Sequence, residues 1–257
     1  MIIAADNLNA LNPKVAEALN NLDPKPIQEI ALACVQAQAD LLDINPGYLS
    51  KTQEDRIIFL VETVQEVTSL DLILDSPNPQ ILAKGLAACR RKPILNALTL
   101  EEKKLKEILP LAVEFKTPLV ILLLDEHSIP PKTLEGKLAL AIELRERALS
   151  AGMAEEDLIF DPLLPHRSWP DALSQIKALV EMVRLLSTGA LFNLPAKTMV
   201  GLSNLCSGRE RIESFPMEEV CFYLLSGAGL SHCLANVLRP VVVNWINQIQ
   251  HLSLIHS

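Results

Sequence analysis

Short apolar segments alternate with longer amphipathic segments along this chain. The apolar segments are rich in Ile, Leu and Val, as buried strands are, and most end at Asp, Asn or Pro. We predict strands at residues 2–5, 41–45, 70–75, 93–96, 118–124, 158–161, 198–204 and 230–235. We predict the principal helices at residues 24–35, 52–67, 78–90, 99–115, 132–151, 171–186, 216–226 and 236–250.

Local signals mark where several of these helices begin. Asp23 precedes Pro24, which suits a capping residue followed by proline at the first helical position. The segments 52–55 and 99–102 both resemble capping boxes, the first with Asp in place of Glu. These signals favour helices directly after strands.

Eight strand–helix units in one uninterrupted alternation predict a parallel sheet. Eight units in 257 residues fit a closed (β/α)8 TIM barrel, formed as a single domain over residues 1–257. The alternative is an open, doubly wound sheet. No G-x-G-x-x-G motif follows the first strand to favour that alternative.

Composition narrows the classes of function. The chain is 49% hydrophobic and carries a net charge of −8, and its densest basic segment is only Arg90-Arg91-Lys92, so we expect no nucleic-acid partner. Five cysteines without a C-x-x-C pair favour a reducing compartment. With neither a signal peptide nor an apolar run long enough to span a bilayer, we expect a cytoplasmic protein without membrane contact. The histidines have no metal-ligand spacing, so we expect no bound metal.

Polar residues end nearly every predicted strand. Alone, each is explained by a helix cap or a turn. Together they would surround the carboxyl end of a barrel, where barrel enzymes place their active sites. The set consists of Asn9, Asp43, Asn45, Asp75, Asn96, Asp161, Ser203 and Asn204.

Carboxylates and amides suit a neutral heterocycle that has both donors and acceptors. A pterin presents an amino-pyrimidinone edge, which a carboxylate can bind through two hydrogen bonds. The segment Val200-Gly201-Leu202 adds a glycine that permits close approach of backbone or ligand, directly before Ser203-Asn204.

These segments resemble the pterin-binding methyltransferases, closest to the methyltetrahydrofolate:corrinoid/iron–sulfur protein methyltransferases. The resemblance runs in order from the N-terminus to at least Asn204. It rests on Asn9, on the segments 42–47, 74–76 and 94–96, on Asp161-Pro162, and on the segment 201–204.

The resemblance implies a dihydropteroate-synthase-like TIM barrel and a role for each residue. Asp75, Asn96 and Asp161 would hold the pterin ring, and Asn204 would hydrogen-bond ring nitrogen 5. Asn9, Asp43, Asn45, Gly201 and Ser203 would complete the substrate site. The substrate would be methyltetrahydrofolate, and the methyl acceptor would be cobalamin on a separate corrinoid or corrinoid/iron–sulfur protein. Relatives are typically homodimers.

Two departures leave alternatives open. The family usually has G-E-R-x-N after the first strand, where this chain has Ala5-Asp6-Asn7-Leu8-Asn9, so a barrel that binds pterin or a corrinoid protein without turnover remains an alternative. Dihydropteroate synthase is the other alternative, but it typically has a Ser-Arg-Lys-type motif where this chain has Ser203-Asn204. Arg209, Arg211 or Lys197 could meet the anionic tail of a folate.

Overall fold

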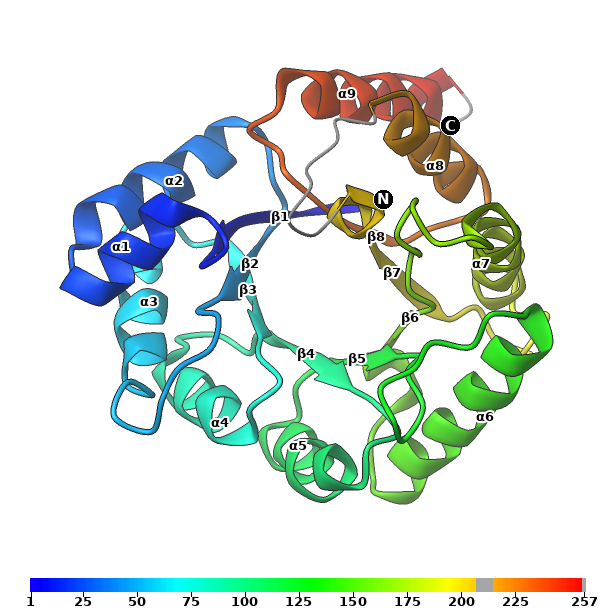
Figure 1. Ribbon diagram of the computed structural model, residues 1–257, viewed down its shortest axis with the longest axis horizontal. Helices are drawn as coiled ribbons and strands as arrows, with labels where there is room; N and C mark the ends of the chain where they lie inside the picture. The colour runs from blue at the N-terminus through cyan, green and yellow to red at the C-terminus, as the bar shows by residue number, and fades with distance from the viewer. Residues whose placement is uncertain (207–214, 256–257) are drawn as a thin grey trace.

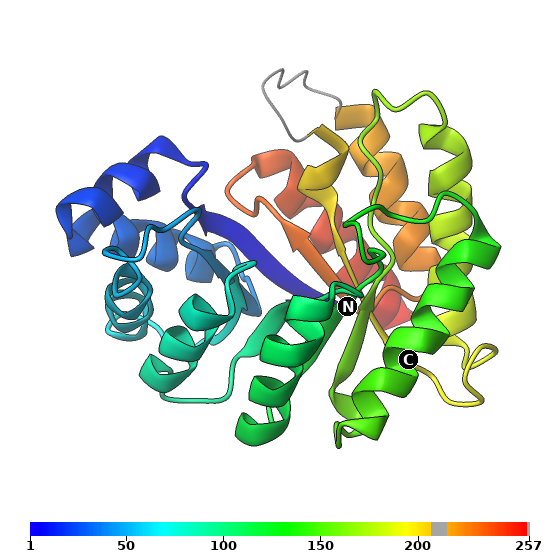
Figure 2. The ribbon, with the colours of Figure 1, turned by 60° about the horizontal axis from the view of Figure 1, so that its bottom comes forward.

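The computed structural model describes residues 1–206 and 215–255. Within them, eight parallel strands close into a barrel in the order β1-β2-β3-β4-β5-β6-β7-β8, and β8 pairs with β1. Figure 1 looks down this barrel and shows the helices arranged as an outer ring. In Figure 2 the green helices α5 and α6 stand in front of the strands. The predicted TIM barrel is confirmed.

Apart from β1 and β7, the strands end within two residues of the predicted positions. They are β1 (Ile2–Asn9), β2 (Leu41–Asn45), β3 (Asp71–Asp75), β4 (Ile94–Leu98), β5 (Leu119–Leu122), β6 (Leu158–Asp161), β7 (Lys197–Gly201) and β8 (His232–Ala235). The α-helices are α1 (Pro13–Asn21), α2 (Pro24–Gln36), α3 (Arg56–Gln65), α4 (Pro79–Ala88), α5 (Glu102–Phe115), α6 (Leu134–Ser150), α7 (Ala172–Ser187), α8 (Phe215–Gly227) and α9 (Pro240–Ile255). Two short 3-10 helices, η1 (Glu155–Asp157) and η2 (Leu202–Cys206), precede β6 and follow β7.

The first strand is longer than predicted. It runs through the polar residues after Ala5 to Asn9, because β2 supplies a pairing partner as far as Asn45. A register irregularity between Ala5 and Leu8 accommodates one extra residue in β1. The strand prediction stopped at Ala5 because an isolated polar run reads as a loop.

The capping predictions have a mixed outcome. The Asp23 carboxylate accepts a hydrogen bond from the Lys25 amide at 3.1 Å, so the predicted cap of α2 is confirmed. The boxes at 52–55 and 99–102 are wrong as caps. Helix α3 begins after Asp55 and α5 begins after Glu101, and neither residue makes a capping side-chain bond. Hydrogen bonds within the preceding turns use the Thr99 and Gln53 side chains instead.

The barrel interior is filled by a small apolar cluster to which every strand contributes. This cluster is separate from the large core between strands and helices. It consists of Ala4, Leu41, Ile73, Ile94, Ala97, Val120, Ile159, Met199 and Leu234. Because side chains alternate across a strand, residues two positions further along each strand face the same interior, one layer nearer its carboxyl end. The apolar cluster is therefore the floor beneath the open carboxyl end of the barrel, which we call the mouth.

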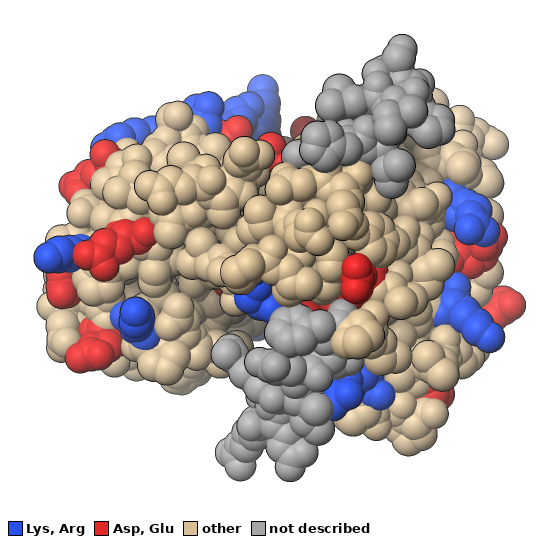
Figure 3. All heavy atoms as spheres, turned by 90° about the horizontal axis from the view of Figure 1, so that it is seen from above, with Lys and Arg blue, Asp and Glu red and all other residues tan. Residues whose placement is uncertain are grey.

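The surface carries mixed charge. On the face in Figure 3, Lys and Arg side chains are scattered among Asp and Glu side chains. Over the described ranges, the search for a helix with the length and apolarity to cross a membrane finds none.

Candidate functional site

Polar residues form the layer above the apolar floor. Asp43 lies two residues after Leu41, Asp75 two after Ile73, Asn96 two after Ile94 and Asp161 two after Ile159. Gly201 occupies the same layer on β7, two residues after Met199. The same alternation places Asp6 in this layer, two residues after Ala4. The barrel therefore gathers side chains far apart in the sequence at one end.

The β2–β4 side of the layer is held together by direct contacts. The Asn45 amide donates to the Asp75 carboxylate at 2.7 Å, and its oxygen accepts from the Gly47 amide at 2.9 Å. Asp75 pairs in register with Asn96 on β4. Asn9 pairs in register with Asn45 at the rim, and its side chain accepts from the Leu11 amide at 2.8 Å. The structure thus brings Asn45, Asp75 and Asn96 together and gives Asn9 a turn-forming bond at the edge.

On the opposite side, Asp161 ends β6. Its side chain is buried, and one carboxylate oxygen accepts from the Leu163 amide at 2.8 Å. Leu163 has a φ of 60°, so a left-handed turn folds the chain back over the carboxylate.

Gly201 and Asn204 form the β7 part of the layer. The prediction that β7 extends through Ser203 and Asn204 is wrong. Both residues lie in the 3-10 helix η2 that follows β7. The turn brings the Asn204 amide back over Gly201, so that a Cβ on Gly201 would lie 3.3 Å from Asn204 Nδ2. The glycine is therefore needed for the approach of the Asn204 side chain.

Asp6 is the residue in this layer that was missed from the sequence. Its carboxylate accepts a hydrogen bond from Ser203, which links β1 to the turn after β7. The signal that could have found it is the alternation Ala4–Asp6, which continues the inward face of β1. It was passed over because β1 was predicted to stop at Ala5.

Asp43 lies in the same layer as Asp6 and is almost completely buried. Its Oδ1 is the one buried side-chain oxygen or nitrogen in the described ranges that lacks a hydrogen-bond partner. A buried polar atom without a partner is costly and is typical of a site that a ligand completes.

Burial shifts the protonation of this layer. It raises the pKa of Asp161 to about 7, against the opposing effects of the Leu163 amide and Lys137. It raises the pKa of Asp75 to about 6, against the hydrogen bond from Asn45 and the charge of Lys104. It also raises the pKa of Asp6, and it raises that of Asp43 well above its ordinary value, with Asp75 and Asp6 adding to the Asp43 effect. Near neutral pH the layer therefore contains both protonated and ionised carboxyls, which can donate as well as accept hydrogen bonds.

Asn7 occupies the position of the arginine missing from the family motif. Its amide donates to the Asn236 side chain at 2.7 Å, and its oxygen accepts from the Val237 amide at 3.2 Å. The Asn7 side chain thus ties β1 to the loop after β8. In this chain, Asn7 therefore stabilises the junction between β1 and the end of β8.

Of the basic residues predicted to meet the anionic tail of a folate, only Lys197 lies within the described residues. Lys197 begins β7, at the opposite end of the barrel from Gly201, and its ammonium donates to the Glu156 carbonyl at 2.7 Å. It cannot serve the mouth, because the strand lies between. Arg209 and Arg211 lie outside the described residues.

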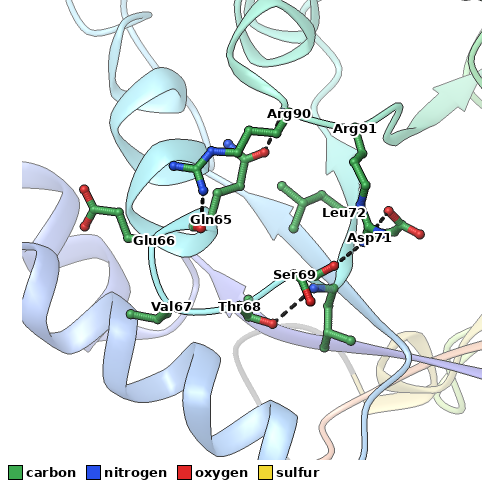
Figure 4. Close-up of a pocket in the computed structure, with 10 residues that line it drawn as sticks. Gln65, Glu66, Val67, Thr68, Ser69, Asp71, Leu72, Arg90 and Arg91 are labelled. Atoms are coloured by element: carbon green, nitrogen blue, oxygen red, sulfur yellow. Dashed lines mark hydrogen bonds and ion pairs between the residues drawn. The ribbon is translucent and has the colours of Figure 1, made fainter.

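A cavity of about 420 Å³ also lies at that opposite end, beneath β3 (Figure 4). Its two arginines are already engaged, Arg90 with the Gln65 carbonyl at 2.7 Å and Arg91 with Asp71 at 2.7 Å. These contacts brace the loops before β3 and β4 and leave the carboxyl end of the barrel as the candidate site.

In the ranges that the structure describes, no three His, Cys, Asp or Glu side chains are grouped as ligands for a metal ion. The polar layer at the mouth is instead a set of single carboxyls and amides from different strands. Such a set suits an organic ring with several donors and acceptors.

Comparison with known proteins also indicates a pterin-binding protein. A family model described as pterin binding enzyme matches residues 6–221. Among curated proteins, the methylcorrinoid:tetrahydrofolate methyltransferase of Eubacterium limosum is 27% identical over 187 residues, which cover 72% of this chain and 69% of that protein. The methionine synthase of Mycobacterium leprae (strain TN) is 23% identical over 264 residues, and the match spans 97% of this chain but 21% of that protein.

Solved structures share the fold. A Yersinia pestis dihydropteroate synthase with a pterine–sulfa conjugate superposes with a TM-score of 0.67 at 17% identity, covering 98% of this chain and 94% of that one. A Xanthomonas albilineans dihydropteroate synthase in complex with 7,8-dihydropteroate gives a TM-score of 0.69 at 14% identity, covering 100% and 93%. At these identities the likeness concerns the barrel itself.

Proposed function

This chain belongs to the pterin-binding enzymes, and from that premise we propose that it moves a methyl group between nitrogen 5 of 5-methyltetrahydrofolate and the cobalt of a corrinoid protein. The observation that carries the proposal is the Asn204 amide, seated against Gly201 beside a layer of buried carboxyls. The Eubacterium limosum relative, a methylcorrinoid:tetrahydrofolate methyltransferase, supports methyl transfer between a corrinoid and a folate.

The carboxyl layer accounts for pterin binding. The amino-pyrimidinone edge has adjacent N–H donors that one ionised carboxylate accepts in parallel. Asp161 and Asp75 lie on opposite sides of the mouth, and Asn96 next to Asp75 adds both a donor and an acceptor. The ring would lie across the apolar floor with this edge against the carboxyls.

The chemical difficulty is the leaving group. A methyl group on a tertiary amine leaves slowly unless the nitrogen carries positive charge. When N5 is protonated, the Asn204 amide oxygen can accept its hydrogen bond. This bond favours the N5-protonated form, from which the methyl group can leave. As the corrinoid takes the methyl group, the electron pair of the broken C–N bond returns to nitrogen, which keeps its proton in the product tetrahydrofolate. Burial raises the pKa of Asp43 well above its ordinary value, which favours a protonated carboxyl in the same layer.

In this scheme the chain supplies binding and orientation, while the corrinoid belongs to a partner and acts as methyl acceptor or donor. The homodimer implied by the resemblance stays a prediction, which light scattering of the purified protein checks. Dihydropteroate synthesis is less well supported, because Ser203-Asn204 stands where that reaction would need the cationic motif for pyrophosphate.

The experiment mixes purified protein with 5-methyltetrahydrofolate and free cob(I)alamin and follows the absorbance of methylcobalamin. Growth of that absorbance supports methyl transfer. Pterin binding without it supports a barrel that binds without turnover. Formation of dihydropteroate from dihydropterin pyrophosphate and 4-aminobenzoate would replace the proposal with the synthase reaction, and absence of all pterin binding would contradict it.

Asn204→Ala is the matching variant. We expect the transfer rate to fall on the order of 10²–10³, as for removal of one transition-state hydrogen-bonding group elsewhere. Asn204 lies in a short 3-10 helix at the rim, so the thermal midpoint should stay near that of the parent protein. Unchanged turnover would remove Asn204 from the mechanism.

A further inference from the structure

Lys137 is a buried lysine outside the strand-end layer. It lies on α6, where its side chain is 1% exposed. A lysine this deeply buried is rare and costly unless its charge is compensated. Its ammonium donates to the Pro162 carbonyl at 2.6 Å. Pro162 directly follows Asp161, so the bond joins helix α6 to the turn at the end of β6.

The turn is held from two sides. On the barrel side, the Leu163 amide donates to the Asp161 carboxylate at 2.8 Å. On the helix side, Lys137 holds the carbonyl of the intervening Pro162. Leu163 has to adopt a φ of 60°, which costs energy for a residue with a Cβ. The Lys137 bond helps to maintain this conformation and the direction of the Asp161 side chain.

Lys137 also acts on Asp161 through its charge. Burial lowers the pKa of Lys137 to about 8, and Asp161 opposes that effect. In return, Lys137 favours the ionised form of Asp161, while Asp75 across the mouth disfavours it. Lys137 on α6 and Asp75 on β3 are therefore the two charges that act on the ionisation of Asp161.

We propose that Lys137 is a positioning residue for pterin binding, which favours the ionised form of the Asp161 carboxylate and fixes the turn that aims it into the barrel mouth. The inference rests on the proposed function, because it takes Asp161 to bind the pterin edge. Lys137 itself lies behind the turn. It therefore acts on the substrate only through Asp161 and the Pro162 carbonyl.

The test uses Lys137→Met, which keeps an apolar stem but removes the charge, and Lys137→Arg, which restores a cation. The probe is 5-methyltetrahydrofolate, titrated across neutral and alkaline pH. For Lys137→Met we expect Kd to rise about tenfold near neutral pH, the size of one lost charge-assisted hydrogen bond. The pH below which binding weakens, the acid limb of the binding profile, should rise, because Asp161 then ionises less readily. KM should rise with little change in kcat, and Lys137→Arg should recover part of the binding.

Leu140→Ala on the same helix is the matched control. Leu140 is buried on the same face of α6, and its truncation lowers stability without touching the Asp161 turn. A lower thermal midpoint with parental Kd in this control, alongside weakened binding in Lys137→Met, supports positioning. Equal loss of affinity in both variants would make the effect a general one of stability and overturn the inference.

The outcomes separate this inference from the proposed function. If the parent protein binds the probe and transfers methyl groups while Lys137→Met keeps the parental Kd and acid limb, the inference is overturned and the function stands. If the parent binds no pterin, both fall. Should Lys137→Met not fold, the comparison uses Lys137→Gln, which has no charge, and Lys137→Arg, which keeps one. If pterin binding weakens at the same pH in these two variants, the result contradicts a role for the charge.

Discussion

At the scale of single residues, Gly201 and Asn204 depend on each other. A Cβ at Gly201 would stand 3.3 Å from the Asn204 amide nitrogen, closer than most side-chain contacts allow. The amide would have to shift by a few tenths of an ångström, away from the position in which we propose that it meets nitrogen 5. Small displacements of a reacting contact have large effects on rate.

Gly201→Ala should therefore slow methyl transfer while changing stability little. We expect a loss of about tenfold or more in kcat, measured with methyltetrahydrofolate and cob(I)alamin. Gly227→Ala is the matched control, since a Cβ there meets nothing within 4 Å. Equal rates for the two alanine variants would show that the fit of Asn204 against Gly201 has no part in the reaction.

At the scale of elements, the two ends of strand β3 have different roles. Strand β3 begins at Asp71, which pairs with Arg91 at 2.7 Å, and ends at Asp75, which accepts from Asn45 at 2.7 Å. Both are aspartates of the same inward alternation. The carboxyl end belongs to the proposed substrate site, whereas the amino end braces a loop.

Asp75→Ala should weaken pterin binding, and Asp71→Ala should leave it unchanged. Loss of a bidentate carboxylate contact is expected to raise Kd on the order of tenfold to a hundredfold. Fluorescence titration with 5-methyltetrahydrofolate measures both variants. Parental affinity in Asp75→Ala would leave that residue only its bond to Asn45.

The elements also show how far sequence reasoning reaches. Strands β2 and β6 were predicted at their observed bounds, because apolar runs ending in Asp or Asn are unambiguous there. The barrel followed from the count and order of units. Asp6 was missed because tertiary pairing with β2, which no local pattern reports, extends β1 through polar residues to Asn9.

Lys137 was missed for a different reason. The prediction of a helix at 132–151 did not single it out, although it shares the spacing of Leu140, Ala141 and Leu144 on the buried face of α6. A lysine at a core position of an amphipathic helix is a signal that the pattern itself contains. What the sequence could not supply is its partner, since the Pro162 carbonyl is brought near only by the packing of α6 on β6.

At the scale of the whole molecule, the gathered carboxyls make stability depend on pH. The pKa of Asp161 is raised from 3.8 to about 7, so its ionisation opposes folding. A carboxyl with a raised folded-state pKa contributes stability that is fully present below its unfolded-state pKa and is lost as pH rises through the folded-state value. Asp75, raised to about 6, acts in the same direction, whereas burial lowers the pKa of His232 and acts in the opposite one.

A difference between two proteins isolates the Asp161 contribution, because the other groups are common to both. Asp161→Asn keeps an oxygen that can accept from the Leu163 amide but cannot ionise. Relative to the parent, this variant should gain free energy of unfolding as pH rises from about 4 to about 7, by roughly a few kcal/mol, and the gain should level off above that window. Urea unfolding of both proteins without ligand, at several pH values, measures this difference. A difference that does not vary with pH would mean that Asp161 titrates normally, and would contradict the raised pKa that burial gives it.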